Sequence, residues 1–360
     1  MIVNPVGATG IDRILHHSGK DRSYDVTIID GKVKRHNFQY TESNIEEYII
    51  EGGLAISGSN SRHYFGIITN NNFYYGHFSK ANKTSRTKSS FWKYFHPKKN
   101  LHVPTHFDIE GKKQYTFTDP VNLCFSLNAY WHWFNEDLPL FRYLRTNDFQ
   151  ILTNKLTDWQ LESIEYFPDI KKRIVQLDTP CVIKSPRFYA FTKPDNGGGR
   201  NAKWTTEFLK DNFKAKAGAP VKKIYISRNA DAEARGVDNE AQVKDFLRPL
   251  GFEFYDKFSA LTLQEKVDLL HSCEVVISAT GANLTHVYAM QPRTTVIDFN
   301  HKFLLETEYW YNNVGDTAGL NWVTCGMPTG SPTKRPKLKN NNLIVSIETL
   351  EQAISLCNLK

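Results

Sequence analysis

The sequence predicts an α/β protein of two domains, in which the N-terminal part is rich in β-strands. Three observations support this prediction. The chain has 360 residues, whereas domains average roughly 150 residues. Residues 1–120 contain short aromatic and β-branched runs between Gly, Asn and Ser, whereas the second half alternates strand-like and helix-like segments. Hydrophobic residues make up 40% of the chain and charged residues 23%, a composition typical of globular proteins.

The composition also excludes several classes of protein. No stretch approaches the roughly 18 apolar residues that a membrane-spanning helix needs, so we exclude a polytopic membrane protein. Residues 1–20 lack an apolar core before a cleavage site, which predicts no signal peptide and a cytoplasmic location. The five cysteines are scattered and form no CxxC or Cys/His cluster, so we expect neither structural zinc nor a disulfide framework.

The net charge of +7 is concentrated in two segments. Residues 80–99 hold seven Lys and Arg, residues 331–339 hold four, and neither segment contains an acidic residue. Without them, the remaining 34 basic residues are outnumbered by 38 acidic ones. Because aromatic side chains are interleaved with the cations of residues 80–99, this segment suits peripheral contact with an anionic membrane. Single-stranded nucleic acid and a solvated loop are the alternatives.

The expected elements follow in chain order. Short extended runs between polar turns predict N-terminal strands at residues 24–29, 64–68 and 72–75. In the second half we expect strands at residues 222–228, 252–258, 274–278 and 294–299, and helices at residues 239–250, 263–273 and 284–290. Gly251 suits the end of one helix, and Thr262 with Glu265 has the spacing of a capping box. This alternation specifies βαβ units and a parallel, Rossmann-like sheet.

An aromatic segment begins at residue 122 and contains His132, Glu136 and Asp137. On a helix, the i,i+4 spacing of His132 and Glu136 places both side chains on one face, and Asp137 lies about 100° away. A carboxylate beside an imidazole orients the ring and supports its protonated form, which suits a general base. The alternative is a core helix in which the two side chains satisfy each other. Pro139 is expected to kink or reset this helix.

Ligands of parallel α/β sheets bind beyond the carboxyl ends of the strands. The candidate binding residues near such ends are Arg228, Arg235, Asn239, Glu240, Thr280, Gly281, Ala282, Asn283 and Asp298. Arg228 and Arg235 could form bidentate contacts with phosphate. The small-residue turn at 280–283 would let backbone amides approach a phosphate at a helix start, and Asp298 would accept ribose hydroxyls. The alternative for the turn is tight packing between helix and strand.

Three segments resemble glycosyltransferase family 61, the DUF563-type enzymes. They are residues 128–141 (NAYWHWFNEDLPLF), 224–240 (IYISRNADAEARGVDNE) and 269–299 (LLHSCEVVISATGANLTHVYAMQPRTTVIDF). The family's His-Trp-x-x-Asp/Glu-x-x-Pro motif falls on His132, Trp133, Glu136 and Pro139. Its ISR-x-A-x(4)-R-x(3)-NE signature falls on Arg228, Arg235, Asn239 and Glu240, and its Gly-Ala turn falls on Thr280, Gly281, Ala282, Asn283 and Leu284. The resemblance covers residues 122–325.

The sequence departs from this family at three positions. Thr280 stands where many members have His, so no imidazole is available there. Asn283 replaces a Gly or Ala, which narrows the space beside the phosphates. Leu140 takes the place of the usual Arg after the proline, with Arg142 nearby.

The resemblance implies a GT-B architecture, in which two Rossmann-like domains face each other across a cleft. We expect an N-terminal acceptor-side domain at residues 1–205, a nucleotide-sugar-binding domain at 206–345 and a C-terminal helix at 346–360. The implied enzyme is an inverting, metal-independent hexosyl- or pentosyltransferase with no cofactor. Its expected donor is a UDP-linked sugar, and its acceptor is a glycan or lipid-linked glycan, as in capsule and other polysaccharide biosynthesis.

The residues themselves agree with several of these implications. No DxD-type carboxylate pair follows a predicted strand, so the leaving diphosphate must be neutralised by protein groups such as Arg228 and Arg235. His132, Glu136 or Asp137 would take the proton from the acceptor hydroxyl. The alternative is a catalytically silent nucleotide- or glycan-binding protein on the same scaffold, which the departures at Thr280 and Asn283 favour. Binding to nucleic acid is not expected, because no matching motif is present.

Overall fold

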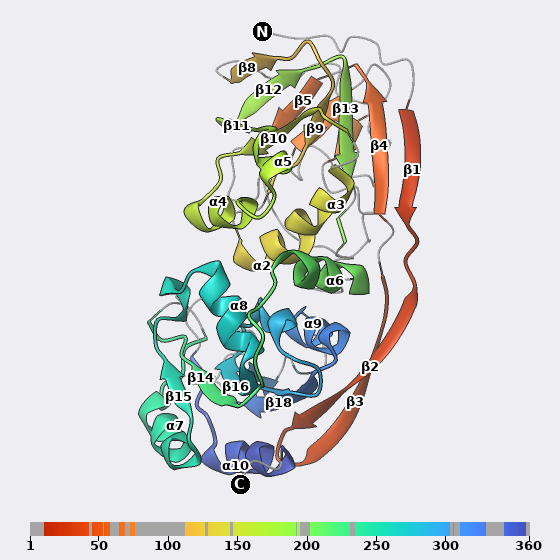
Figure 1. The fold of residues 1–360 in the computed structure, drawn as a ribbon. Helices are drawn as coiled ribbons and strands as arrows, with labels where there is room; N and C mark the ends of the chain where they lie inside the picture. Colours follow the sequence, from red (N-terminus) through yellow and green to blue (C-terminus); the bar gives the residue numbers. More distant parts are fainter. Residues whose placement is uncertain are drawn as a thin grey trace. The chain divides into compact units, whose positions relative to one another are not determined.

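The fold is a mixed α/β structure with parallel strands in each of its two parts (Figure 1). The computed structural model describes residues 11–42, 45–52, 54–57, 65–68, 73–75, 112–126, 129–144, 147–191, 193–194, 202–230, 235–302, 305, 310–328 and 342–357. The basic segments 80–99 and 331–339 lie outside the described residues. The chain divides into unit 1 (residues 1–19 and 43–194) and unit 2 (residues 20–42 and 195–360).

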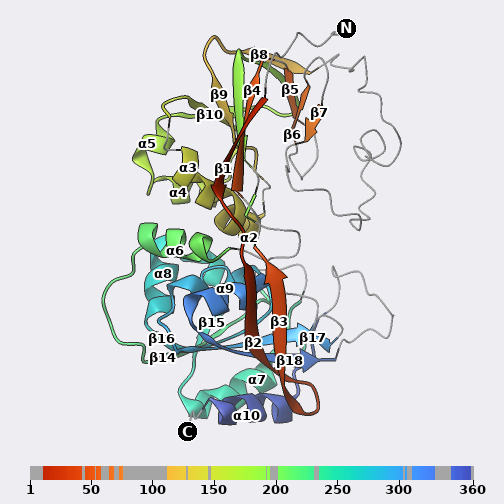
Figure 2. The same cartoon turned by 90° about the vertical axis from the view of Figure 1, so that its right-hand side faces the viewer.

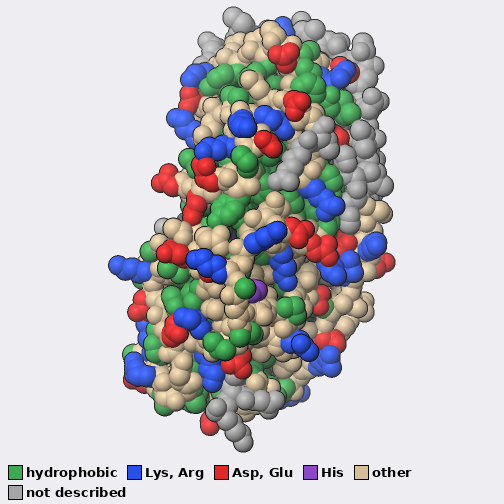
Figure 3. All heavy atoms as spheres, viewed as in Figure 1, with side chains coloured by type: hydrophobic (Ala, Val, Ile, Leu, Met, Phe, Trp, Pro, Cys, Tyr) green, Lys and Arg blue, Asp and Glu red, His purple; other side chains and the backbone are tan. Residues whose placement is uncertain are grey.

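This division differs from the domain boundaries expected from the sequence. Residues 20–42 belong to unit 2 although they lie in the predicted N-terminal domain, and the C-terminal helix is part of unit 2. Within the described part of the chain, no helix has the length and apolarity needed to cross a bilayer. Figure 3 shows acidic and basic side chains interspersed over one face of the molecule. This agrees with the near balance of charge outside the two basic segments.

Unit 1 contains two sheets around a shared core. The first sheet has the order β1 (Ile11–His17), β4 (Ile45–Glu51), β13 (Arg187–Phe191), β9 (Val121–Leu123), β10 (Gln150–Asn154) and β11 (Ile174–Leu177). The second has the order β7 (Phe73–Tyr75), β6 (Phe65–Ile68), β5 (Leu54–Ser57), β12 (Cys181–Lys184) and β8 (Lys113–Thr116). Strands β13, β9, β10 and β11 are parallel, whereas β4 and β1 are antiparallel additions. Buried apolar residues of both sheets, such as Ile183 and Phe188, form one cluster.

The helical segments of unit 1 connect its parallel strands. Between β9 and β10 lie α2 (Tyr130–His132), the π-helical turn η1 (Trp133–Asp137), the 3-10 turn η2 (Leu138–Leu140) and α3 (Phe141–Leu144). Helices α4 (Asp158–Ile164) and α5 (Pro168–Lys171) lead from β10 to β11. Pro139 has no N–H to continue the helical hydrogen bonds, and η2 contains it at its start. The predicted reset of the helix at Pro139 is therefore confirmed.

Unit 2 contains a seven-stranded sheet in the order β15 (Glu253–Tyr255), β14 (Lys222–Ile226), β16 (Cys273–Ala279), β17 (Thr295–His301), β18 (Asn321–Met327), β2 (Asp21–Ile29) and β3 (Val33–Thr41). All neighbours are parallel except β2 and β3, which form a hairpin. In chain order, the five strands from β14 to β18 follow the doubly wound order 2-1-3-4-5. The sheet therefore has a topological switch point between β14 and β16.

Helices cover both faces of this sheet. Helices α7 (Glu240–Leu247) and α10 (Ile347–Leu356) lie on one face, and α8 (Leu263–His271) and α9 (Trp310–Ala318) lie on the other (Figure 1). Another helix of unit 2, α6 (Lys203–Asn212), contacts α9. Val243 and Leu247 from α7, and Leu350 and Ile354 from α10, are buried against the strands. The C-terminal helix thus contributes to the core of unit 2.

The predicted alternation of strands and helices in this half is confirmed apart from one element. Gly251 ends the α7 segment with a left-handed φ of 80°, and Thr262 with Glu265 forms the predicted capping box of α8. The predicted helix at residues 284–290 is wrong. Two short 3-10 turns occupy this region, η5 (Ala282–Leu284) and η6 (Val287–Ala289). Short apolar runs do not distinguish one helical geometry from another.

The β2–β3 hairpin extends the sheet from a distant part of the sequence. Figure 2 shows it beside β18, and the register pairs Val323 with Thr27 and Cys325 with Ile29. Ile28 and Ile29 are fully buried. The left-handed turn at Gly31, with a φ of 69°, joins the two strands. A segment predicted to lie in the N-terminal part therefore completes the sheet of unit 2.

Candidate functional site

The ends of two neighbouring strands bring together several predicted binding residues of unit 2. Strands β14 and β16 are parallel, with Ile226 opposite Ser278. Arg228 follows β14, and the turn at residues 280–283 follows β16. Because the strand order reverses between these strands, this edge is where an open α/β sheet is expected to bind a ligand.

The guanidinium of Arg228 lies directly against the backbone of Gly281. Only 7% of Arg228 is exposed. A Cβ atom built on Gly281 would lie 1.8 Å from Nη1 and 2.2 Å from Cζ of Arg228, far inside van der Waals contact. The space that the guanidinium occupies therefore exists because residue 281 has no side chain. Gly281 was predicted to admit a phosphate, and the structure shows that it admits the arginine.

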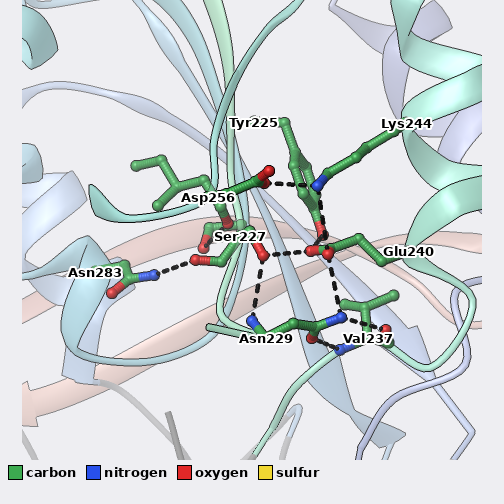
Figure 4. A network of polar contacts seen from close by, with 10 residues as sticks. Tyr225, Ser227, Asn229, Val237, Glu240, Lys244, Asp256 and Asn283 are labelled. Carbon is green, nitrogen blue, oxygen red and sulfur yellow. Dashed lines mark hydrogen bonds and ion pairs between the residues drawn. The ribbon is translucent and has the colours of Figure 1, made fainter. Parts of the chain in front are cut away.

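Glu240 connects the start of α7 to the end of β14 (Figure 4). Its carboxylate accepts hydrogen bonds from Ser227 Oγ at 2.5 Å, Tyr225 Oη at 3.0 Å and Asn229 Nδ2 at 3.1 Å. Three donors on the strand end and the following loop thus meet one acceptor at the helix start. We interpret Glu240 as the residue that fixes the loop carrying Arg228, rather than as one that touches a ligand.

Asn283 forms a second connection across the switch point. Its Nδ2 atom donates to the carbonyl oxygen of Ser227 at 3.0 Å, as Figure 4 shows. The side chain that replaces the family's Gly or Ala therefore links the turn after β16 to the loop after β14. Ala282 begins the three-residue turn η5. Because η5 is so short, the turn offers backbone amides but no helix dipole of the kind predicted.

Two other predicted binding residues also contact the protein. Asn239 accepts a hydrogen bond from the backbone N–H of Val345 at 2.9 Å and donates to its carbonyl oxygen at 2.8 Å. These bonds fasten the segment that leads into α10. Arg235 has a left-handed φ of 64°. Burial, together with the charge of Arg235, lowers the pKa of His301, the last residue of β17, to about 4.

Asp298 is buried within the sheet and anchors Thr280. Its carboxylate accepts hydrogen bonds from Thr280 Oγ1, from Trp322 Nε1 at 2.8 Å and from Thr324 Oγ1 at 2.6 Å. Burial raises the pKa of Asp298, and these donors partly offset that effect. Only 4% of the residue is exposed. These contacts indicate that Asp298 anchors the turn. The sequence had instead predicted that Asp298 binds ribose hydroxyls.

The second group of predicted residues lies in unit 1, on the segment after β9. The backbone N–H of Leu138 bonds the carbonyl oxygen of Trp133, five residues earlier, so the turn that carries Glu136 and Asp137 is π-helical. In an α-helix the two acids would diverge by about 100°. In this wider turn both approach one ammonium group: Lys193 Nζ lies 2.6 Å from Asp137 Oδ1 and 3.8 Å from Glu136 Oε2.

The three candidate bases have different surroundings. His132 Nδ1 lies 2.5 Å from Glu136 Oε1, and 24% of the His132 side chain is exposed. The Asp137 side chain is 2% exposed and accepts a hydrogen bond from Ser126 Oγ at 2.7 Å in addition to its ion pair with Lys193. His132 is therefore the candidate with the greatest access to solvent, and Glu136 is the carboxylate that orients its ring.

The electrostatics of this group favour a basic imidazole. Burial lowers the pKa of His132, but the hydrogen bond and charge of Glu136 raise it by more, so the pKa lies above its usual value. If Nδ1–H donates to Glu136, Nε2 is the nitrogen that accepts a proton. Lys193, although buried, has a raised pKa because Asp137 and Glu136 favour its charged form more than burial opposes it.

The sequence did not lead us to Lys193 or Ser126. Lys193 follows β13 and Ser126 follows β9, and these two strands are parallel neighbours. One feature of the sequence could have indicated Lys193. It is a lysine just after a buried strand, at the same sheet edge as the His132 segment. Over the described part of the chain, no group of three or more His, Cys, Asp and Glu side chains is arranged to hold a metal ion.

Two solved structures show limited similarity to this chain. The bacterial iron-containing dodecameric glycosyltransferase TibC from enterotoxigenic E. coli H10407 aligns over 94% of this chain and 88% of that chain, with 9% identity and a TM-score of 0.34. The dodecameric iron-containing heptosyltransferase TibC in complex with ADP-D-beta-D-heptose aligns over 79% of this chain and 76% of that chain, with 11% identity and a TM-score of 0.31. These scores are too low to assign a fold or a ligand.

A comparison with curated proteins finds no match. In contrast, the family model described as Glycosyltransferase 61 matches residues 130–297. The matched range begins at the segment that carries His132 and Glu136, contains Arg228, and includes the turn at residues 280–283. The resemblance inferred from these motifs is confirmed, because residues 130–297 match the model of glycosyltransferase family 61.

Proposed function

We propose that this glycosyltransferase is an inverting, metal-independent enzyme that uses a nucleotide-sugar donor. The acceptor is the hydroxyl group of a glycan or lipid-linked glycan, and the layout is GT-B, with one Rossmann-like domain for each substrate. The observation that carries the proposal is the buried guanidinium of Arg228 on Gly281, beside an amide-lined turn at the switch point of a doubly wound sheet. This arrangement suits a phosphate-bearing ligand.

The donor's diphosphate would leave from this edge of the sheet. Its negative charge increases as the bond from C1 of the sugar to the phosphate oxygen breaks, so a fixed positive group stabilises the transition state. Arg228 supplies permanent charge and parallel N–H donors, and the backbone amides of residues 281–283 add neutral donors, whereas the N–H of Thr280 bonds the carbonyl oxygen of Phe299. Because η5 is only three residues long, we assign the larger part of the transition-state stabilisation to Arg228. We expect a UDP-linked donor.

His132 would act as the general base. Its Nε2 takes the proton from the acceptor hydroxyl, whose oxygen attacks C1 from the face opposite the nucleotide. One C–O bond forms as the C1–phosphate bond breaks, so an α-linked donor gives a β-glycoside. Because the pKa of His132 is raised, the acid limb of the activity profile should have its midpoint above the usual imidazole value. Activity falls below this midpoint as the base becomes protonated.

The test is the release of free nucleotide during incubation with a panel of UDP-, GDP-, CDP- and ADP-linked sugars, with and without an acceptor glycan. We expect turnover with one donor class, no loss of rate with EDTA, and a loss of at least ~100-fold in His132→Ala, as is typical of a missing general base. Arg228→Ala should weaken donor affinity by roughly 10- to 150-fold, since hydrogen bonds to charged groups contribute about 1.5–3 kcal/mol. Undiminished affinity in Arg228→Ala would contradict the assignment.

The turn at residues 280–283 supports a second candidate function. Thr280 is buried and donates to Asp298, and Asn283 donates to Ser227, so the turn that replaces the family's His and Gly is closed by its own contacts. This favours a silent nucleotide-binding protein on the same scaffold. A thermal-shift response to a nucleotide sugar without any turnover, unchanged by His132→Ala, would support this alternative.

A further inference from the structure

Lys193 is a buried cation that the catalytic proposal does not yet use. It is 8% exposed and lies two residues after β13. Lysine is almost never buried without an anionic partner, because its ammonium loses its hydration. Here the partners are two consecutive acids, Asp137 at 2.6 Å and Glu136 at 3.8 Å.

The surrounding contacts fix this ammonium group in one place. Asp137 is held from the other side by Ser126 Oγ at 2.7 Å, and Ser126 Oγ in turn accepts a hydrogen bond from Gln160 Nε2 at 3.1 Å. Ser126 follows β9, and Gln160 is buried in α4. The Asp137–Lys193 pair is thereby attached to two elements outside the π-helical turn. Lys193 reaches Glu136 from this fixed position.

The charge of the cluster depends on Lys193. With Glu136, Asp137 and Lys193 ionised and His132 neutral, the four groups sum to one negative charge, and protonation of His132 neutralises them. Among the described residues, Cys124 is a further titratable neighbour of Lys193 and Asp137, and burial raises its pKa to about 12, so it stays neutral. Without Lys193, two buried carboxylates would face the imidazole uncompensated. They would hold its proton more tightly.

We infer that Lys193 is a positioning residue, which holds Glu136 against His132 and limits how strongly the paired acids bind a proton on that imidazole. The catalytic consequence rests on the proposed function, because it requires His132 to be the base. The charge coupling itself requires only the cluster. Lys193 thus opposes Glu136: Glu136 raises the pKa of His132, and the charge of Lys193 limits that increase.

The test compares the titration of His132 in three variants of the full chain, followed by NMR of the labelled imidazole. In Lys193→Met we expect the His132 pKa to rise by about one unit, which is the size of shift that a nearby charge produces. Lys193→Arg retains the charge and should restore the pKa. The double variant Asp137→Asn with Lys193→Met removes one charge of each sign, so its pKa should return close to that of the wild type.

The double variant also provides a folded comparison if Lys193→Met alone is unstable. In that case the Asp137→Asn single variant, which leaves Lys193 charged beside only one acid, should lower the His132 pKa. The acid limb of kcat/KM should move with the NMR titration in each variant. An unchanged His132 pKa in a folded Lys193→Met or Asp137→Asn protein would overturn the inference. If the His132 pKa shifts in the variants but the wild-type protein has no transferase activity, the proposed function is overturned and the charge coupling stands.

Discussion

At the scale of single residues, the guanidinium of Arg228 packs directly against the backbone of Gly281. The guanidinium lies where a Cβ atom on residue 281 would have to be, so neither residue can be understood alone. A glycine in a turn before a helix is usually explained by the approach of a ligand to the backbone. In this turn the approaching group belongs to the protein, and it carries the positive charge that a phosphate ligand would need.

We predict that Gly281→Ala weakens donor binding by displacing Arg228. The loss should equal that of Arg228→Ala, roughly 10- to 150-fold in Kd, because the same charged hydrogen bonds disappear. The double variant should be no weaker than either single variant, since both changes remove one interaction. Isothermal titration with the donor's nucleoside diphosphate measures this. Gly218→Ala, where an added Cβ meets nothing within 4 Å, is the control and should bind normally.

At the scale of elements, the loop after β14 is held by the start of α7. Ser227, Tyr225 and Asn229 all donate to the carboxylate of Glu240. Sequence reasoning placed Glu240 among the ligand-binding residues because it belongs to the family signature. The structure gives a different reason for a carboxylate at this position: it accepts from the buried hydroxyls of Tyr225 and Ser227, and burial of a hydroxyl without a partner is unfavourable.

Glu240→Ala is therefore expected to destabilise unit 2 and not only to weaken ligand binding. Loss of the acceptor shared by the buried hydroxyls of Tyr225 and Ser227 should reduce the free energy of unfolding by about 1–3 kcal/mol. Urea unfolding followed by circular dichroism measures the change. Glu351→Ala, an exposed position on α10, is the matched control and should change the free energy by less than about 0.5 kcal/mol. Equal free energies of unfolding for the two variants would show that Glu240 does not stabilise unit 2.

At the scale of the whole molecule, unit 2 is assembled from two distant parts of the chain. Residues 20–42 supply β2 and β3, while residues 195–360 supply the rest. Strand β2 continues the parallel sheet beyond β18, so its apolar residues enter the same core as α10 and β17. The stability of unit 2 therefore depends on residues near the N-terminus.

We predict that Ile29→Ala, near the N-terminus, destabilises unit 2 by about 2–5 kcal/mol. Ile29 is fully buried in the core that includes Val323 and Leu350, and removal of a buried isoleucine side chain leaves a cavity. Hydrogen exchange of β18 amides should report faster opening in this variant. Val33→Ala, at a side chain that is 49% exposed on β3, should leave β18 exchange unchanged.

The sequence by itself determined most of the βαβ alternation of residues 222–299, the caps at Gly251 and Thr262, the resemblance to glycosyltransferase family 61, and several residues at the switch point. These features depend on periodicity and on groups a few residues apart, and such local patterns can be recognised in a single sequence. Only the tertiary structure decided that residues 20–42 complete the sheet of unit 2, that Arg228 occupies the space above Gly281, and that Lys193 joins both acids of the π-helical turn. Each of these depends on contacts between residues more than 50 apart or on a helical geometry that short aromatic runs do not specify. In these three cases the conformation is selected by packing against residues distant in the sequence, and not by local conformational preference.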